Sequence, residues 1–332
     1  MDVCPYTNCQ LTLSHSELSS SDAVLFHIVD VFLEKFKLPA TRNPSQIWIG
    51  LTYEPPFILE NSGVSLQKLN GLFNRTMTYR TDGDIVARHG TFSKITGNSI
   101  LPSYTSNWVN SHETTKERNY AAGKHHLVAW FASADSKGKC DSQSGREIYV
   151  KELQKHVKVD IYGSCGSFKC GGKKNMRNSY KVEEDDCFMM VSQDYKFVLA
   201  FENTLCQDYV TEKLFNHLKL NVIPVVFGAN NYSAVAPPKS VIDASEFEPE
   251  ELAKYLKLLD KNDTLYNEYF EWKKDYLVVS HDGVPLACDL CAKLNNPEWK
   301  TERKVYDDFD KWFRKGCKKG FDHDKTKINL VN

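Results

Sequence analysis

Short apolar runs, most of them followed by polar loops, divide the chain into predicted strands. They cover residues 23–29, 47–51, 127–132, 157–162, 195–200 and 222–227. Runs of this length are typical of buried strands. Apolar residues at helical spacing predict helices over residues 146–156, from about Asp208 and from Pro249. Strands that alternate with helices indicate a parallel, doubly wound α/β fold.

The polar stretch between Phe201 and Lys213 is the point around which the chain is organised. It follows the strand at 195–200 and precedes a helix predicted to start near Asp208. In open α/β sheets, ligands bind where strands end, and helix N-termini favour phosphate groups. Glu212 and Lys213 fall in the first turn, where a lysine is unfavourable unless an anionic ligand lies nearby. An ordinary N-cap with a solvated charge pair fits these features equally well.

The chain of 332 residues is long enough for two domains. We expect a first domain over residues 1–119, a second over 120–280, and a C-terminal segment, 281–332, that packs back. In the first domain, the strand at 47–51 leads to Glu54, in a loop that Pro55 and Pro56 stiffen. An amphipathic C-terminal helix is predicted from the spacing of Trp299, Tyr306, Phe309, Trp312 and Phe313.

Charge and hydropathy exclude two classes of function. A net charge of -1 gives no sign of a nucleic-acid-binding surface. The sequence has no run of 18 apolar residues and no charged-then-apolar leader, so neither a membrane span nor a signal peptide is expected within it.

Ten cysteines and three glycosylation sequons, at Asn74, Asn231 and Asn262, favour an oxidising, lumenal compartment. Cys288 and Cys291 form a Cys-x-x-Cys pair, which fits half of a zinc site, a redox pair or two structural disulfides. We favour disulfides because no second Cys-x-x-Cys completes a zinc ribbon. Pairing cannot be read from the sequence for the remaining central and C-terminal cysteines, Cys140, Cys165, Cys170, Cys187, Cys206 and Cys317.

Three motifs suggest other chemistry at first sight. Residues 166–173 resemble a phosphate-binding P-loop, but lysine stands at position 173 instead of 172. No Gly-x-Gly-x-x-Gly follows a strand, which removes the fingerprint of a dinucleotide dehydrogenase. Asp82-Gly83-Asp84 fits a divalent metal site or a surface turn, and we expect the turn.

A family resemblance rests on the stretch around Lys213. Phe201-Glu202-Asn203 and Tyr209-Val210-Thr211-Glu212-Lys213 resemble the signature of the α-1,3-fucosyltransferases of glycosyltransferase family 10. Further segments are similar to the family, at residues 76–84, 225–229, 240–243, 251–256 and 269–273.

The resemblance implies a GT-B fold, in which two Rossmann-like α/β domains face each other across a cleft. Residues 1–119 would form the acceptor-side domain and residues 120–280 the GDP-fucose-binding domain. It also implies that Cys4 and Cys9 are disulfide-bonded to Cys288 and Cys291. The expected location is the Golgi lumen, with this chain as the soluble part of a protein whose N-terminal membrane anchor and stem lie outside it.

The activity that the resemblance implies is inverting transfer of L-fucose from GDP-β-L-fucose to the 3-hydroxyl of N-acetylglucosamine in glycoprotein glycans. The acceptor would be the innermost residue of an N-glycan or an outer lactosamine unit. The cysteine pattern resembles that of invertebrate members and favours the core acceptor. Such a transfer needs a base for the acceptor hydroxyl and positive charge for the diphosphate. The base activates the acceptor hydroxyl on the face opposite the leaving group.

Matched to the family's motifs, Glu54 would be the catalytic base and Arg146 and Lys213 would contact the diphosphate. Glu212 would contact the ribose or the fucose. The remaining donor-site positions are Asn203, Tyr209 and Glu202. The resemblance implies no metal and no cofactor beyond the GDP-fucose substrate.

Two rival functions stay open from the sequence. One is a non-catalytic glycan-binding relative of the same fold, since Ala134 stands where the family usually has asparagine. The intact Glu54 and the Glu212-Lys213 pair argue against it. The other is a GT-B transferase for a different nucleotide sugar, which stabilisation by GDP, UDP or CMP would distinguish.

Overall fold

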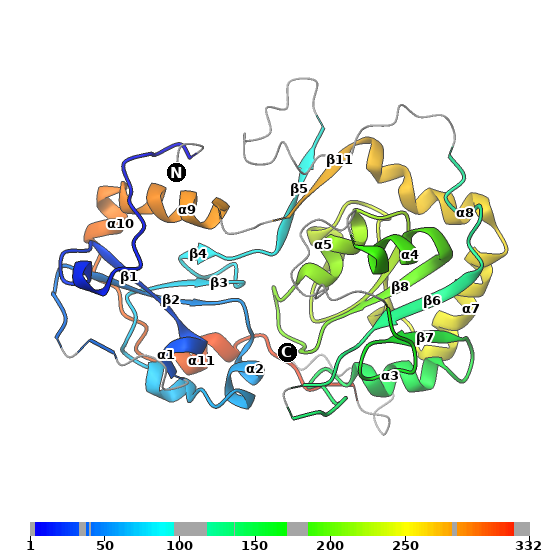
Figure 1. Ribbon diagram of the computed structural model, residues 1–332, viewed down its shortest axis with the longest axis horizontal. Coiled ribbons are helices and arrows are strands. Elements are labelled where there is room, and N and C mark those ends of the chain that lie inside the picture. The colour runs from blue at the N-terminus through cyan, green and yellow to red at the C-terminus, as the bar shows by residue number, and fades with distance from the viewer. Residues whose placement is uncertain are drawn as a thin grey trace.

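The computed structural model describes residues 4–32, 38–39, 41–95, 118–135, 137–170, 185–280 and 284–321. They form two α/β lobes that lie side by side, with chain segments crossing from one to the other (Figure 1). No helix within these described ranges is long and apolar enough to cross a membrane.

A parallel sheet in the order β1-β2-β3-β4 is the centre of the first lobe. Its strands are β1 (Ala23–His27), β2 (Ile47–Thr52), β3 (Arg75–Thr78) and β4 (Ile85–Val86). The chain around them forms the helices α1 (Ile28–Phe32) and α2 (Pro56–Asn61), and the 3₁₀ helices η1 (His15–Glu17) and η2 (Leu66–Leu69). β2 is almost wholly buried, as its unbroken apolar sequence predicts.

The strand predicted over residues 23–29 is too long. β1 ends at His27, and Ile28 begins α1. Ile28 is fully buried, so the apolar run does continue into the core. Hydrophobicity alone does not distinguish a buried strand from a short buried helix, and here the backbone changes from one to the other.

The second lobe contains a five-stranded parallel sheet in the order β10-β9-β8-β6-β7. Its strands are β6 (His126–Phe131), β7 (Val159–Tyr162), β8 (Tyr195–Phe201), β9 (Ile223–Phe227) and β10 (Ile242–Asp243). Helices that cover it or connect its strands are α3 (Arg146–Leu153), α4 (Asp186–Asp194), α5 (Glu212–Leu218), α6 (Tyr232–Val235), η6 (Ala244–Glu246) and α7 (Pro249–Asp260). The doubly wound fold predicted for this half is confirmed.

β8 runs through the middle of this sheet, and all seven of its residues are buried. Phe197 and Leu199 pack in one cluster with residues of α3 and α7, whereas Val198 packs on the other face with residues of α4. Ala200 also points to that second face, where α5 contributes Leu214 and Phe215. This alternation explains why β8 is apolar on both faces after Tyr195 and Lys196 at its start. The helix predicted over residues 146–156 ends earlier, at Leu153.

A two-stranded antiparallel ribbon lies at the top of the view, where the two lobes meet (Figure 1). It pairs β5 (Gly90–Lys94) with β11 (Tyr276–Ser280). Before β11, the chain forms α8 (Asp263–Asn267) and the 3₁₀ helix η7 (Glu268–Lys274). The sequence analysis predicts neither strand of this ribbon.

The C-terminal segment packs back on the first lobe. It forms α9 (Val284–Leu294), α10 (Pro297–Thr301) and α11 (Phe309–Arg314). The prediction of one amphipathic helix through Trp299 and Phe313 is therefore wrong. Trp299 packs beside β2 and β3, whereas Phe309 and Phe313 belong to a separate cluster around η2.

Arg75 is one physical reason for the break between α10 and α11. Its Nη2 donates to the carbonyl oxygen of Trp299 at 2.7 Å and to that of Glu302 at 3.0 Å. Tyr306 N donates to the Phe73 carbonyl oxygen at 3.0 Å, which ties the following residues to the first lobe. These contacts take up backbone groups that a continuous helix would need for itself.

The prediction of a surface turn at Asp82-Gly83-Asp84 is correct for Asp82, which is exposed, but not for Asp84, whose side chain is nearly buried. Asp82 is exposed and pairs with Arg80 at 2.8 Å. The side chain of Asp84 is 6% exposed and pairs with Lys304 at 2.9 Å. It also accepts a hydrogen bond from the Tyr306 hydroxyl at 2.7 Å, so Asp84 holds the C-terminal segment on the sheet.

All ten cysteines are in disulfides. Cys4 bonds to Cys288 and Cys9 to Cys291, which is the pairing expected from the resemblance. The zinc and redox readings of Cys288 and Cys291 are therefore wrong. The pairs that the sequence leaves open are Cys140–Cys165, Cys170–Cys187 and Cys206–Cys317.

The Cys206–Cys317 bond joins the loop after β8 to a final segment that returns from α11 to the second lobe. We call residues 315–321 the return segment. Lys318 N donates to the Leu205 carbonyl oxygen at 2.7 Å, and Phe321 N donates to that of Ser144 at 2.8 Å.

Candidate active site

The loop between β8 and α5 brings the signature residues to the edge where the strands of the second sheet end. α5 begins at Glu212, with Thr211 as its N-cap, and not near Asp208 as predicted. Asp208 has a positive φ of 67°, which a helix cannot contain. Its carboxylate accepts hydrogen bonds from Thr81 N and Thr81 Oγ1 of the first lobe, at 3.0 and 2.8 Å. This cross-lobe contact fixes the loop conformation just before Tyr209.

Glu202 holds the loop together from inside. Its side chain is 1% exposed. It accepts hydrogen bonds from Thr211 N at 2.9 Å and from Thr211 Oγ1 at 3.0 Å. The oxygens of Glu202, which the resemblance makes a donor-site residue, contact Thr211 and Lys213, so Glu202 positions both of them.

The ammonium of Lys213 lies among three oxygen ligands. Its Nζ is 2.9 Å from Thr211 Oγ1, 3.2 Å from Glu202 Oε2 and 3.4 Å from Glu212 Oε1. Burial alone would lower the pKa of Lys213, but the charges of Glu202 and Glu212 outweigh it and raise the pKa. The residue therefore stays a cation in a partly buried site.

Glu54 enters this cluster from the first lobe. It follows β2, its backbone N donates to Thr52 Oγ1 at 3.0 Å, and Pro55 caps α2 immediately after it. Burial raises the pKa of Glu54, against the opposing charge of Lys213 and a hydrogen bond from the side chain of Tyr209. A general base works best when its pKa approaches the working pH, so this environment suits proton abstraction.

Aromatic rings pack where the two lobes meet at Glu54. The ring of Tyr79, at the end of β3, lies edge-on to that of Tyr209 with centroids 5.1 Å apart. Burial raises the pKa of Tyr209 well above its usual range, so its phenol stays protonated. Tyr209 is therefore a hydrogen-bond donor to Glu54 and a packing partner for the first lobe.

Arg146 and Asn203 flank the cluster on the side of α3. Nη1 of Arg146 donates to the Phe201 carbonyl oxygen at 2.7 Å, and Nε contacts Glu147 at 2.9 Å. Arg146 also acts on the charge of Lys213, which places both cations at the same end of the sheet. The Oδ1 atom of Asn203 is buried and has no hydrogen-bond partner among the residues that the structure describes.

The structure thus brings Glu54, Tyr209, Glu212 and Lys213 together directly and places Arg146 and Asn203 beside them. Sequence reasoning missed the contributions of Tyr79, Thr81 and His89 of the first lobe. His89 Nδ1 lies 3.4 Å from Glu212 Oε2. Tyr79 and Thr81 belong to the segment 76–84 that resembles the family, which could have marked them, but nothing in the sequence singles out His89.

The three predicted glycosylation sites differ in accessibility. Asn231 and Asn262 are exposed at the N-caps of α6 and α8. Asn74 is partly buried, its Nδ2 donates to the Lys304 carbonyl oxygen at 2.9 Å, and its Oδ1 accepts from Trp48 N at 2.9 Å. We therefore expect glycans at Asn231 and Asn262 rather than at Asn74.

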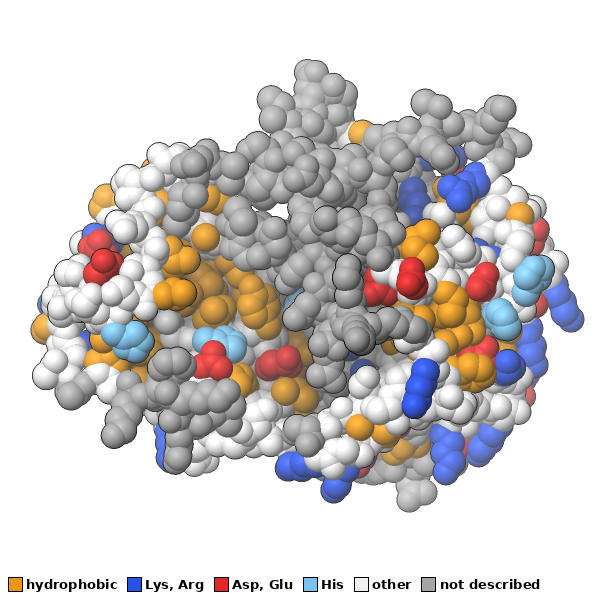
Figure 2. Space-filling view, in the orientation of Figure 1, with side chains coloured by type: hydrophobic (Ala, Val, Ile, Leu, Met, Phe, Trp, Pro, Cys, Tyr) orange, Lys and Arg blue, Asp and Glu red, His pale blue; other side chains and the backbone are white. Residues whose placement is uncertain are grey.

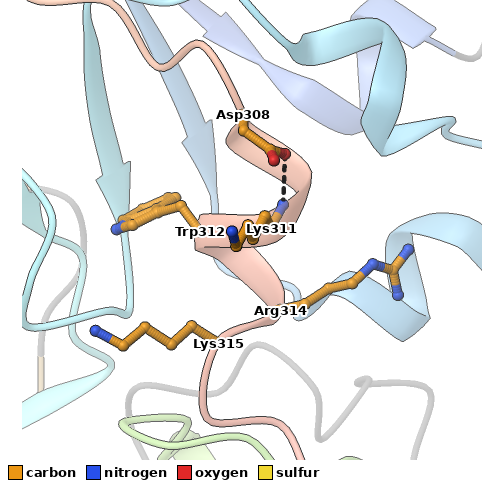
Figure 3. Close-up of a pocket in the computed structure, with 5 residues that line it drawn as sticks. All are labelled: Asp308, Lys311, Trp312, Arg314 and Lys315. Carbon is orange, nitrogen blue, oxygen red and sulfur yellow. Dashed lines mark hydrogen bonds between the residues drawn. The ribbon is translucent and has the colours of Figure 1, made fainter.

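The two lobes differ in where their side-chain types lie on the visible face. Figure 2 shows apolar side chains gathered on the face of the first lobe, while lysines and arginines line the lower edge of the second. An open hollow of about 550 Å³ lies beside α11. Trp312 and Lys315 project to one side of this helix and Arg314 to the other (Figure 3). None of the residues that line the hollow belongs to the Glu54–Lys213 cluster: Asp308, Lys311, Trp312, Arg314 and Lys315.

Two facing α/β lobes with parallel sheets, and a cluster that joins a carboxylate of one to the cations of the other, define a GT-B glycosyltransferase. The chain belongs to glycosyltransferase family 10, the fucosyltransferases. The family's C-terminal model matches residues 121–312, and the fucosyltransferase N-terminal model matches residues 1–90.

Relatives from animals match nearly the whole chain. Alpha-(1,3)-fucosyltransferase C of Drosophila melanogaster is 34% identical over 323 residues, which is 95% of this chain and 71% of that protein. Glycoprotein 3-alpha-L-fucosyltransferase A of the same fly is 35% identical over 94% of this chain, which spans about half of that protein (55%). A human 4-galactosyl-N-acetylglucosaminide 3-alpha-L-fucosyltransferase is 33% identical, over 90% of this chain and 71% of its own length.

A solved structure of an alpha1,3-fucosyltransferase with GDP-fucose is also similar. It is 18% identical in sequence, with a TM-score of 0.48, and the match covers 86% of this chain and 80% of that one.

Proposed function

We propose that the protein transfers L-fucose from GDP-β-L-fucose, with inversion, to the 3-hydroxyl of an N-acetylglucosamine residue in glycoprotein glycans. The observation that carries the proposal is the contact between Glu54 of the first lobe and the Tyr209–Lys213 loop of the second. The raised pKa of the Glu54 carboxyl group and the nearby charge of Lys213 support its role as the base of this reaction. Family membership and the names of the relatives support the same reaction.

In this reaction Glu54 removes the proton from the attacking hydroxyl. Lys213 and Arg146 stabilise the negative charge that develops on the diphosphate as the glycosidic bond breaks. Glu212 and Asn203 bind hydroxyl or base groups of the donor, because a carboxylate and an unpaired amide oxygen are acceptors for such groups. The two cations supply positive charge in place of a metal ion, so the reaction proceeds without one.

The acceptor is either the innermost N-acetylglucosamine of an N-glycan or an outer lactosamine unit. A relative named a glycoprotein fucosyltransferase and one named for a 4-galactosyl-N-acetylglucosaminide acceptor align with this chain at similar identity, 35% and 33%. We further propose that the reaction takes place in the Golgi lumen. The five disulfides require an oxidising compartment, and the family resemblance implies a membrane-anchored full-length form.

A transfer assay with GDP-fucose and a panel of core and lactosamine glycans tests the proposal, with NMR of the product to establish linkage and anomer. We expect an α-1,3-linked fucose on one of the two acceptor classes. Thermal unfolding with GDP, UDP and CMP provides a second measurement, since a ligand that binds the folded state raises its stability. Stabilisation by UDP or CMP but not by GDP would refute the assigned donor.

A further inference from the structure

His89 lies at the point where the chain leaves the first lobe for the interlobe ribbon. It stands between β4 and β5, one residue before Gly90. Gly90 is packed so closely on α5 that a Cβ atom there would lie 2.5 Å from the ring of Phe215. A side chain at position 90 would push the chain at this position away from α5. The path of the chain past α5 is therefore fixed at His89.

The imidazole of His89 touches both halves of the candidate active site. Its Nδ1 lies 3.4 Å from Glu212 Oε2 in the first turn of α5. Its ring lies edge-on to the ring of Tyr53, with centroids 5.3 Å apart. Tyr53 is the residue before Glu54, so one side chain contacts the neighbour of the candidate base and a candidate donor contact.

The two carboxylate oxygens of Glu212 have different partners. Oε1 is 3.4 Å from the ammonium of Lys213, and Oε2 faces His89. Burial raises the pKa of Glu212, but the nearby charge of Lys213 outweighs that effect and lowers it, so the group is a carboxylate. Burial lowers the pKa of His89, which favours a neutral ring, and Nδ1 is the ring nitrogen that faces Glu212. With one partner on each oxygen, the plane of the Glu212 carboxylate is fixed.

We propose that His89 is a positioning residue for donor binding. It fixes the orientation of the Glu212 carboxylate from the opposite lobe. Glu212 therefore accepts hydrogen bonds from the hydroxyl groups of the donor only while the two lobes keep the relative position seen here. This inference rests on the proposed function, because it takes GDP-fucose as the molecule that Glu212 contacts. His89 itself need not touch the donor. Its effect passes through Glu212 alone, and the ring edge on Tyr53 keeps the imidazole in place.

Substitutions that separate the two contacts of His89 test this inference. His89→Phe keeps an aromatic ring against Tyr53 but removes the donor to Glu212. His89→Asn keeps an N–H donor near the position of Nδ1. We expect His89→Phe to raise the KM for GDP-fucose on the order of 10-fold, as loss of a hydrogen bond to a charged group does, with the acceptor KM unchanged. His89→Asn should recover most of the loss.

A double-mutant cycle shows whether the effect passes through Glu212. The combination of His89→Phe with Glu212→Gln should raise the donor KM no further than Glu212→Gln alone. His27→Phe is the matched control, because His27 also pairs with a carboxylate, Asp30 at 2.7 Å, on the exposed surface. This control should leave the donor KM unchanged.

Three outcomes overturn the inference while the proposed function stands. The first is an active wild type whose donor KM is unaltered by His89→Phe, and the second is additivity of the effects of His89→Phe and Glu212→Gln on the donor KM. The third is an equal rise of the donor KM in His89→Phe and His89→Asn together with a lowered melting temperature. The last outcome would show a purely structural role. A wild type that neither binds GDP nor transfers fucose would instead refute the proposed function, and the inference with it.

Discussion

Glu54→Gln removes one negative charge from a site where the carboxylates of Glu54, Glu202 and Glu212 act on one another and on Lys213. Glutamine keeps the shape of the side chain and can still accept the hydrogen bond from Tyr209, but it cannot take a proton at neutral pH. Loss of a general base typically costs about 10²–10⁴-fold in rate. That range corresponds to about 2.7–5.5 kcal/mol in activation free energy.

The same substitution should not weaken the fold. Burial raises the pKa of Glu54, so the folded protein binds this proton more tightly than the unfolded chain does. Ionisation of Glu54 therefore costs stability. The cost begins above the unfolded pKa, about 4.3 for glutamate, and is complete above the raised folded pKa. At neutral pH the melting temperature of Glu54→Gln should equal or exceed that of the wild type, and the difference should shrink at pH 4.

Three measurements examine this reasoning together: steady-state transfer of fucose, calorimetry with GDP, and thermal unfolding at both pH values. We expect transfer to fall into the stated range while the affinity for GDP stays nearly unchanged, because the donor contacts lie on the other lobe. Glu17→Gln is the control, since Glu17 is exposed in η1. If Glu54→Gln retains more than about a tenth of wild-type turnover, Glu54 is not the base.

Three further predictions follow from the same site and surface. Lys213→Ala should weaken GDP binding on the order of 10–100-fold, because a charged contact to the diphosphate is lost; an unchanged Kd in calorimetry would contradict this. Transfer should persist in EDTA, since Lys213 and Arg146 supply the positive charge; loss that manganese restores would refute the metal-free mechanism. Peptide mapping of protein from a glycosylating host should find glycans at Asn231 or Asn262 and none at Asn74; occupancy of Asn74 would show that its buried hydrogen bonds are wrong.

The strands could be predicted wherever both of their faces are buried. β9 is apolar along its length, and β2 and β8 are apolar except for Thr52 in β2 and for Tyr195 and Lys196 in β8, so their sequences indicate buried strands. The ribbon of β5 and β11 was missed because its strands pair across a long stretch of sequence and only part of its residues are buried.

The start of α5 illustrates the limit of local signals. Asp208 and Thr211 are both good N-cap residues, and sequence offers no choice between them. The contact of Asp208 with Thr81 of the other lobe decides in favour of Thr211. A tertiary contact of this kind leaves no trace in the local pattern.

In the candidate site too, residues in motifs could be predicted, whereas roles that depend on tertiary contacts could not. Glu54, Glu212 and Lys213 were found because they stand in recognisable motifs. The motif could not show that Glu202 is enclosed by Thr211 and Lys213, since burial of a carboxylate depends on what surrounds it in space. His89 lies far from Glu212 in sequence, and only folding brings the two together.

The pairing of the chain ends has a consequence for how the protein is made. Cys4 and Cys9 are synthesised long before their partners Cys288 and Cys291, which follow them by 284 and 282 residues. During translation both early thiols are therefore exposed to the wrong partners, including each other, while the second lobe folds. Wrongly formed bonds must be exchanged later, through attack by a thiolate. Yield from a secreting host should then depend on disulfide isomerase, and a chain that stops at Ser280 would leave Cys4 and Cys9 without their partners.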